Sequence, residues 1–177
     1  EREKRREREW NENQLEGRNA VLEVLRSGRD IEKIMVQKGN VEGTIKRIVS
    51  QKEEKGVVIQ EVSRQKQDEL SQTKNHQGVI ALVSAHDYVE VEDILAAARA
   101  KGEDPFIILL DGITDPHNLG AILRTAECAG AHGVIIPKRR SVGLNATVGK
   151  TSAGAIEYMP VAKVTNLVKT MEQLKKE

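Results

Sequence analysis

The sequence predicts an α/β protein with two small domains. Short runs rich in β-branched residues alternate with amphipathic helical stretches, and residues 106–137 have the pattern strand, polar loop, helix, glycine stop and second strand. A polar stretch before Asp104-Pro105 separates the two halves. We therefore expect a charged extension over 1–14, a compact α/β domain over 15–84, a linker and helix over 85–104, and a parallel α/β domain over 105–177.

The first domain is expected to alternate helix and strand. Runs such as IEKIMV, VVIQEV and GVIALV are rich in β-branched residues and indicate strands, whereas Val41, Ile45, Ile48 and Val49 have the spacing of a helix face. A domain of roughly 70 residues is small but able to fold alone. The expected elements are helices over about 18–27, 41–54 and 64–71, and strands over 31–37, 57–62 and 78–84.

The second domain is expected to begin with a buried strand at 106–110 and to continue with a helix. That helix carries an apolar stripe that should pack on a sheet. Asn118 stands where the N-cap belongs, and Gly130 stands where a left-handed C-cap belongs. The stripe consists of Leu119, Ile122, Leu123, Ala126 and Ala129.

Further parallel strands are expected at 132–137 and 161–164. After the last of them, Thr165 should cap a helix that carries Leu167, Met171 and Leu174 on one face. Two or three parallel strands with their helices still lack a strand to complete the layered fold. We therefore expect this α/β domain to be incomplete.

Three features of the second domain go beyond what a packed helix needs. Gly120 lies in the first turn of the predicted helix, where glycine costs about 1 kcal/mol relative to alanine, so a close approach to its backbone is expected. Arg124 lies four residues further on, on the same face as Gly120 and outside the apolar stripe. The polar loop over 111–118 follows a strand end, where open α/β sheets place their ligands. The alternative is a well-capped helix with a solvated arginine.

The stretch DPHNLGAILRTAECAG resembles the first motif of the SpoU (TrmH-type) RNA ribose 2'-O-methyltransferases, Asn-x-Gly-x-x-x-Arg-x-Ala, matched by Asn118, Gly120, Arg124 and Ala126. The segment HGVIIPKRRSVGLNATVGKTSAGAIEYMPVAKVTNL resembles the bacterial branch that methylates a guanosine ribose in large-subunit (23S) ribosomal RNA. LEGRNAVLEVL and NHQGVIALV resemble the small RNA-binding domain of that branch. The resemblance implies a SPOUT-type (knotted) methyltransferase domain, S-adenosylmethionine as donor, and a homodimer.

The departure from the family is also informative. Its members carry two further motifs, a Gly-Glu-Gly type turn and a Ser-Leu-Asn type segment, which form the knot, hold the cofactor and supply much of the dimer contact. This chain ends at Glu177 before either motif. We therefore expect no cofactor-binding residues in this chain, and S-adenosylmethionine binding and dimerisation only in a complete domain.

The resemblance also implies candidate catalytic residues. Arg124 would take or stabilise the proton of the ribose hydroxyl, and Asn118 would hold the loop. A free guanidinium has a pKa above about 12 and is a poor base. We therefore expect Arg124 to bind an RNA phosphate or the developing alkoxide, while the acceptor of the proton stays open.

Two further places are candidates for RNA binding. Gly17-Arg18-Asn19 opens the first helix and His76-Gln77-Gly78 opens the last strand of the first domain; a helix start and a turn are the structural alternative. The resemblance implies RNA recognition by Arg18, Asn19, His76 and Gln77, which combine a cation for phosphates with amide and imidazole groups for 2'-hydroxyls and base edges.

Three adjacent cations, Lys138, Arg139 and Arg140, follow the strand at 132–137. The structural alternative is a solvated loop, but the position beside the polar loop favours capture of RNA phosphates.

Composition bounds the remaining choices. Residues 1–104 carry 19 basic and 21 acidic side chains and residues 105–177 carry 9 and 6, so the small positive excess lies in the second domain. The single cysteine, Cys128, excludes an internal disulfide framework, suits the cytoplasm and is expected as a small apolar filler in its helix. The four histidines lack metal-ligand spacing, and no apolar run is long enough for a membrane span, so we expect neither a metal nor a membrane partner.

Two alternatives to an enzyme of ribosomal RNA stay open. One is a non-catalytic RNA-binding module. The other is a small-molecule-binding α/β domain that uses the loop over 111–118.

Overall fold

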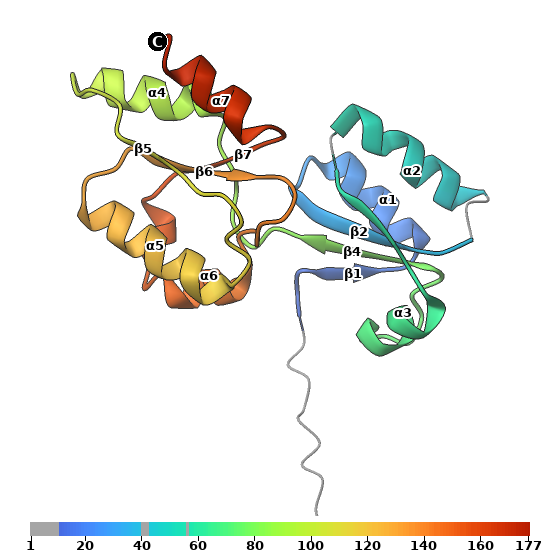
Figure 1. Ribbon diagram of the computed structural model, residues 1–177. Helices are drawn as coiled ribbons and strands as arrows, with labels where there is room; N and C mark the ends of the chain where they lie inside the picture. The colour runs from blue at the N-terminus through green and yellow to red at the C-terminus, as the bar shows by residue number, and fades with distance from the viewer. Residues whose placement is uncertain (1–10, 40–42, 56) are drawn as a thin grey trace, which may run out of the picture. The chain divides into compact units, whose positions relative to one another are not determined.

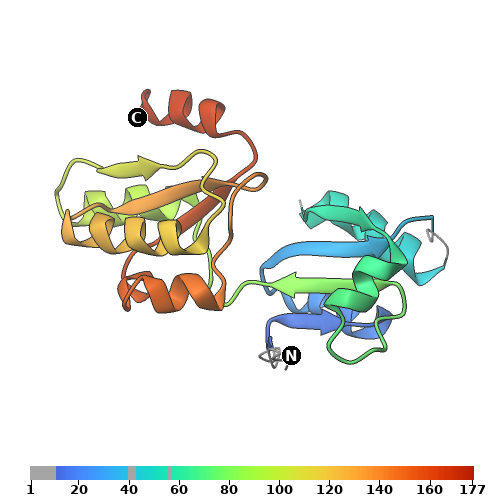
Figure 2. The same ribbon diagram turned by 60° about the horizontal axis from the view of Figure 1, so that its bottom comes forward.

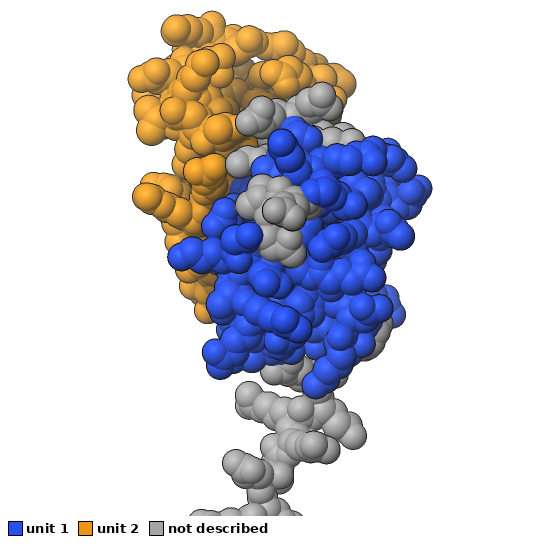
Figure 3. Space-filling model, turned by 90° about the vertical axis from the view of Figure 1, so that its right-hand side faces the viewer, with its two compact units in different colours: residues 1–83 blue, residues 84–177 orange. Residues whose placement is uncertain are grey.

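The chain divides between Val83 and Ser84 into two compact units (Figure 3). The computed structural model describes residues 11–39, 43–55 and 57–177. The charged run at 1–9 and the start of the helix expected at 41–54 therefore lie outside the described residues. Each unit is described by itself below.

The first unit is built on a mixed four-stranded sheet with the order β1-β4-β2-β3 (Figure 1). β4 runs antiparallel to both β1 and β2, whereas β3 runs parallel to β2. All six predicted elements are present, and the predicted ends that fall on described residues differ from the observed ones by up to two residues. The strands are β1 (Gln14–Glu16), β2 (Ile31–Gln37), β3 (Ile59–Val62) and β4 (Val79–Val83), and the helices are α1 (Arg18–Ser27), α2 (Thr44–Lys55) and α3 (Arg64–Leu70).

The core of the first unit lies between the sheet and the helices α1 and α2. Alternate residues of β2 and β4 point into it, as expected for a sheet with one apolar face packed on helices. β1 was not expected from the sequence; it is short and pairs with the last strand of the unit. The central side chains are Val21, Val24, Leu25, Ile34, Ile45, Ile48, Val79 and Ala81.

The second unit is a three-layer α/β/α arrangement around the parallel sheet β5-β6-β7 (Figures 1 and 2). α5, α6 and the 3-10 turn η1 supply the core on one face of the sheet, and α4 and α7 pack on the other. The strands are β5 (Ile107–Leu109), β6 (Gly133–Pro137) and β7 (Val161–Val164). The helical elements are α4 (Val91–Ala100), α5 (Pro116–Cys128), α6 (Ala146–Thr151), η1 (Ala155–Glu157) and α7 (Leu167–Leu174).

The segment expected as linker and helix folds as part of the second unit. α4 begins in a capping box in which Asp93 accepts a hydrogen bond from the backbone amide of Glu90, 3.0 Å away. Ile94 of α4 is buried in the core layer that it shares with Ile135 of β6. The helix was therefore predicted, but its packing makes it a layer of the domain.

Three local expectations for the second unit need correction. β5 is half-buried because it is an edge strand that pairs only with β6 among the described strands. The N-cap of α7 is Asn166, whose side chain accepts from the Lys169 amide at 2.9 Å, so the helix starts one residue later than a Thr165 cap would place it. Met171 is exposed, and Leu167 and Leu174 are half-buried.

No helix in the described part of the chain is both long and apolar enough to cross a bilayer.

Candidate functional site

Two loops meet at the carboxyl edge of the parallel sheet in the second unit. The Ile113 carbonyl, in the loop after β5, accepts from the Val142 amide at 2.8 Å and from the Ser141 hydroxyl at 3.3 Å. The Lys138 amide donates to the Val164 carbonyl, at the end of β7, at 2.8 Å. The structure therefore ties the segments after β5 and β6 to each other and to the end of β7, at the edge where α/β folds bind ligands.

The helix after β5 begins earlier than the sequence pattern suggested. Its N-cap is Asp115, whose carboxylate accepts from the His117 amide at 2.8 Å. Pro116 follows at the first helical position, where its fixed φ fits the helix and its missing N–H is not needed. The expectation of an Asn118 cap was wrong, because the Asp-Pro pair begins the helix three residues sooner. Gly130 has the predicted left-handed conformation, with φ 76°.

Gly120 is a packing glycine between two helices. A Cβ atom built on it would collide with the Thr151 side chain of α6 and would lie 2.9 Å from the Ser152 nitrogen. The Thr151 hydroxyl donates to the Thr147 carbonyl of its own helix at 2.9 Å and also lies 3.2 Å from the Pro116 carbonyl, so α6 contacts the start of α5. The close approach to Gly120 was predicted, but it comes from a neighbouring helix. Gly120 lies in the second turn of α5.

Asn118 and Arg124 are both exposed on α5. Neither side chain makes a hydrogen bond or an ion pair with another described residue. Six residues along a helix correspond to a rotation of about 600°, so the two side chains point in directions roughly 120° apart. Gly120 and Arg124 lie about 40° apart around the helix, as expected, but Gly120 is buried whereas Arg124 is exposed. The two candidate side chains are free for a ligand but do not form a preassembled pair.

The cationic run follows β6 at this edge of the sheet. Lys138 is half-buried, whereas Arg139 and Arg140 are exposed. Arg140 has a φ of 58°, in the left-handed region that side chains other than glycine seldom adopt. The turn of the chain at Arg140 leads directly into Ser141, the residue that contacts the loop after β5.

In the first unit, Arg18 and Gln77 hold one another across the start of α1. Gly17 is the N-cap and has no side chain to accept a hydrogen bond, so the side-chain oxygen of Gln77 accepts from the Arg18 amide at 3.2 Å. The Arg18 Nε donates to the Gln77 carbonyl at 3.2 Å. Asn19 and Gln77 are exposed and Arg18 is half-buried. The structure thus brings Arg18, Asn19 and Gln77 to one place.

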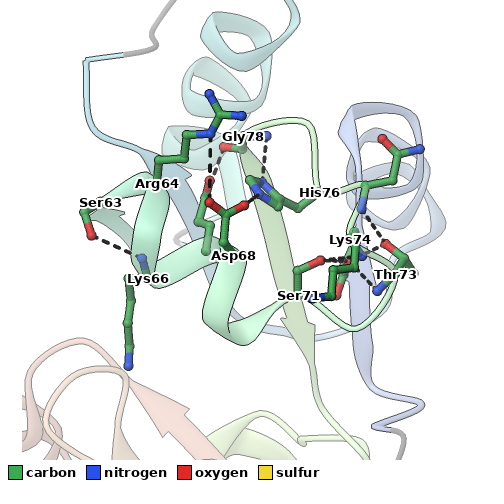
Figure 4. A network of polar contacts seen from close by, with 12 residues as sticks. Ser63, Arg64, Lys66, Asp68, Ser71, Thr73, Lys74, His76 and Gly78 are labelled. Atoms are coloured by element: carbon green, nitrogen blue, oxygen red, sulfur yellow. Dashed lines mark hydrogen bonds and ion pairs between the residues drawn. The ribbon is translucent and has the colours of Figure 1, made fainter.

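His76 is buried, and its ring supports the turn (Figure 4). Its Nδ1 accepts from the Gly78 amide at 3.1 Å. This leaves the proton on Nε2, which donates to Asp68 of α3 at 2.9 Å. Because both ring nitrogens are engaged, the imidazole offers no free group for the RNA contact that was expected of it.

The Glu16 carboxylate orders the loop between α3 and β4. It accepts hydrogen bonds from the Gln14 side chain at 2.7 Å, the Gln72 amide at 2.6 Å, the Ser71 hydroxyl at 2.7 Å, and both the amide and the hydroxyl of Thr73. Partial burial alone would raise the pKa of Glu16, but these hydrogen bonds outweigh it and lower the pKa from 4.5 to about 2.

We expect the first unit to lose stability in acid through Glu16. A carboxyl whose pKa is lower in the folded than in the unfolded state stabilises the fold above pH 4.5 and loses this contribution as the pH falls towards 2. The half-exposed position reduces the effect to about 1–2 kcal/mol. Urea unfolding of the unchanged chain and of Glu16→Gln between pH 2 and 7 measures it. The variant should show a smaller loss of stability in this range, and equal losses would contradict the assignment.

Sequence reasoning did not find Glu16 or Asp68. A charged residue inside a strand is a weak signal, and β1 itself was not predicted. The contacts of Glu16 span 55 to 57 residues of sequence, so they follow from the sheet pairing and not from any local motif.

The remaining candidate groups are the potential metal ligands and the single cysteine. Within the described residues, no group of three or more His, Cys, Asp and Glu side chains is placed to hold a metal ion. Cys128 is exposed near the end of α5, so the expectation of an apolar filler was wrong.

Two family models match the chain. The model for RNA 2'-O ribose methyltransferase substrate binding matches residues 14–89, and the model for the SpoU rRNA methylase family matches residues 105–177. The first match ends beyond the Val83–Ser84 boundary of the structure, and the second begins two residues before β5.

Relatives support the same grouping. A Bacillus subtilis protein named as a TrmH family tRNA/rRNA methyltransferase, YacO, is 48% identical over 159 residues, and a Staphylococcus haemolyticus protein of the same family name is 45% identical. Both alignments include 90% of this chain, which spans 64% of each relative.

Solved structures are more distant. The AdoMet-bound rRNA methyltransferase from Sinorhizobium meliloti is 21% identical with a TM-score of 0.42, over 92% of this chain and 57% of that one. The SpoU methyltransferase AviRb from Streptomyces viridochromogenes is 17% identical with a TM-score of 0.43, over 92% of this chain and 58% of that one.

Proposed function

This chain belongs to the SpoU (TrmH) family of RNA methyltransferases, and from that premise we propose that it acts in S-adenosylmethionine-dependent 2'-O-methylation of a guanosine ribose in 23S ribosomal RNA. One observation supports the location of the reaction most directly. The Ile113 carbonyl, in the loop before α5, accepts hydrogen bonds from Ser141 and Val142, which directly follow the cationic run 138–140. A substrate phosphate beside that run would bring the ribose close to the motif.

The proposed catalytic groups are exposed side chains of α5. Methyl transfer to a ribose hydroxyl needs the oxygen held in line with the methyl donor and its developing negative charge stabilised. The Arg124 guanidinium has no protein partner among the described residues and can offer its planar set of N–H donors to a phosphate or to that alkoxide. Asn118 was expected to hold the loop, but its exposed side chain contacts none of the described residues, so we propose that its amide faces the bound nucleotide. The acceptor of the hydroxyl proton is not assigned.

A buried polar atom without a partner would be one sign of a site for S-adenosylmethionine. The one buried side-chain polar atom without a partner in the described chain is the Oε1 of Gln67, which belongs to the first unit. We therefore assign no residue of this chain to the cofactor and derive no step through it. Cofactor binding and homodimerisation are proposed for the full-length protein, in the cytoplasm.

RNA recognition is divided between two surfaces. In the first unit, Arg18, Asn19 and Gln77 combine a guanidinium with two amides, which suits phosphates together with 2'-hydroxyls. In the second unit, Lys138, Arg139 and Arg140 suit phosphates alone. All residues of the surface in the first unit come from that unit, so it could bind RNA without the second unit. The second candidate function is therefore a non-catalytic RNA-binding module.

Calorimetric titration separates these functions. We expect this chain to bind a 23S rRNA fragment and to show weak or no binding of S-adenosylmethionine. Full-length protein that binds both and methylates the fragment would establish the enzyme. RNA binding without methyl transfer by the full-length protein would support the module, and absence of RNA binding would contradict both.

The cationic run should set part of the salt dependence of RNA binding. If Lys138, Arg139 and Arg140 each neutralise one phosphate, their joint replacement by alanine should reduce the slope of log K against log salt concentration by about 2–3. The matched control replaces three exposed lysines beside the Arg99–Glu177 ion pair, Lys101, Lys175 and Lys176. If both triple variants changed the slope equally, the effect would come from net charge, and residues 138–140 would not form a specific phosphate site.

A further inference from the structure

The loop between α3 and β4 is ordered by a carboxylate that lies outside it. Both oxygens of Glu16 are used: one accepts from Gln14 and from the Gln72 amide, and the other accepts from Ser71 and from Thr73. All of these partners are donors. An isosteric amide at this position would therefore place its own NH2 group against N–H or O–H groups, whichever way it was turned.

The order imposed by Glu16 extends to the tip of the loop. The Ser71 hydroxyl gives its proton to Glu16 and accepts from the Lys74 amide at 2.9 Å. The Thr73 hydroxyl gives its proton to Glu16 and accepts from the Asn75 amide at 3.2 Å. Each hydroxyl has one proton, so the carboxylate fixes the direction of both hydrogen bonds. Figure 4 shows Lys74 against Ser71 and Thr73.

The other end of the same loop is fixed independently. His76 is held between Asp68 of α3 and the Gly78 amide, and Gln77 is held by Arg18. The loop is therefore anchored on both sides of Lys74 and Asn75. Lys74 and Gln77 have φ values of 61° and 52°, a conformation that costs energy for side chains other than glycine and that the anchors maintain.

This anchoring leaves three polar side chains on the outside. Lys74, Asn75 and Gln77 are exposed, and the Lys74 side chain has no partner among the described residues. A Cβ atom at Gly17 would lie 3.5 Å from the side-chain oxygen of Gln77 and 3.7 Å from the Asn75 carbonyl. The tip of the loop therefore lies beside the start of α1 and extends the Arg18, Asn19 and Gln77 surface by one cation and one amide.

We propose that Glu16 is a positioning residue for RNA recognition, and that it holds Lys74 and Asn75 in place to contact the sugar-phosphate backbone of the substrate RNA. The inference rests on the proposed function and adds two contact residues and their support to it. Glu16 itself faces its five donors and does not touch the RNA. Its carboxylate acts through the backbone of the loop. It therefore favours RNA binding, although a negative charge alone would oppose it.

The direction in which RNA affinity changes when the carboxylate is lost tests this proposal. Simple electrostatics predicts that loss of a carboxylate strengthens binding to a polyanion. We expect Glu16→Gln instead to weaken binding of a 23S rRNA fragment roughly tenfold, because the loop loses its order. The matched control is Glu23→Gln, which removes an exposed carboxylate from α1 in the same unit and should leave binding unchanged or slightly tighter. Circular dichroism confirms that each variant is folded at the assay temperature.

Two further measurements separate positioning from general damage. Thr73→Val removes one hydroxyl that links Glu16 to the Asn75 amide and should weaken binding by a smaller factor in a chain that stays folded. In a double-mutant cycle, Glu16→Gln added to Lys74→Ala should cost less than it does alone, since both changes act on one contact.

The outcomes are distinct. If the unchanged chain bound the fragment and Glu16→Gln bound as tightly as Glu23→Gln, the positioning role would be overturned while the proposed function stood. Fully additive effects of Glu16→Gln and Lys74→Ala would overturn the route through Lys74. If the unchanged chain did not bind the RNA, the proposed function would fail and this inference with it.

Discussion

Replacing Arg124 by alanine should reduce methyl transfer to the rRNA fragment at least a hundredfold while the protein stays folded. The guanidinium is exposed and has no partner among the described residues, so its loss should change the free energy of unfolding by less than about 0.5 kcal/mol. A single donor group aimed at developing negative charge is worth about 10²- to 10³-fold in rate. The measurement is transfer of labelled methyl by protein expressed at the full length that its gene encodes.

Two variants sharpen this result. Arg124→Lys keeps the positive charge but loses the planar fork, so partial activity would indicate a role for charge and negligible activity a role for paired hydrogen bonds. Lys101→Ala removes an exposed cation just after α4, before the amino end of β5, and should leave the rate unchanged. More than a few per cent of normal turnover in Arg124→Ala would rule out the proposed role.

Replacing Gly120 by alanine should destabilise the second unit by about 2 kcal/mol. In an isolated helix the same change would stabilise by about 1 kcal/mol, because alanine is the better helix former. Here the new methyl group would meet the Thr151 Cβ at 2.8 Å and the backbone nitrogen of Ser152 at 2.9 Å. Backbone atoms cannot turn aside as a flexible side chain can, so α5 and α6 must separate, and overpacking of this kind costs about 1–3 kcal/mol.

The test is urea unfolding with a matched change on the same helix. Thr125 is exposed on α5, and Thr125→Ala should alter stability only slightly. Adding Thr151→Ala to Gly120→Ala should restore part of the loss, because one of the colliding side chains becomes smaller. A stabilised Gly120→Ala variant would show that the helices do not approach as closely as the structure places them.

The sequence predicted most of the strands and helices in order, because hydrophobic periodicity depends on local neighbours, but it did not predict β1, α6 or η1. It failed at positions where two signals competed. Asn118 and Asp115 are both good N-caps, and the choice fell to Asp115 because the proline after it already has the φ of a first helical residue. Thr165 and Asn166 are also both suitable N-caps, and the structure uses Asn166, one residue later than predicted.

The candidate sites show a different limit. Gly120 was correctly identified as a point of close approach, but sequence alone did not show whether a ligand or a helix approaches it. His76 was expected at the RNA surface, yet the sequence does not show that Asp68 and Gly78 occupy both ring nitrogens. These contacts depend on how the turn before β4 folds against α3, which residue spacing alone does not show.

The pairing of β1 with β4 has a consequence for the architecture of the chain. It places Asn13 and Val83, near the two ends of the described part of the first unit, side by side, where the Val83 amide donates to the Asn13 carbonyl at 2.8 Å. A unit whose ends adjoin can be joined to a host protein at a single surface position without stretching either partner. Ends that adjoin in this way allow residues 13–83 to be inserted into another protein, or circularly permuted, as one piece.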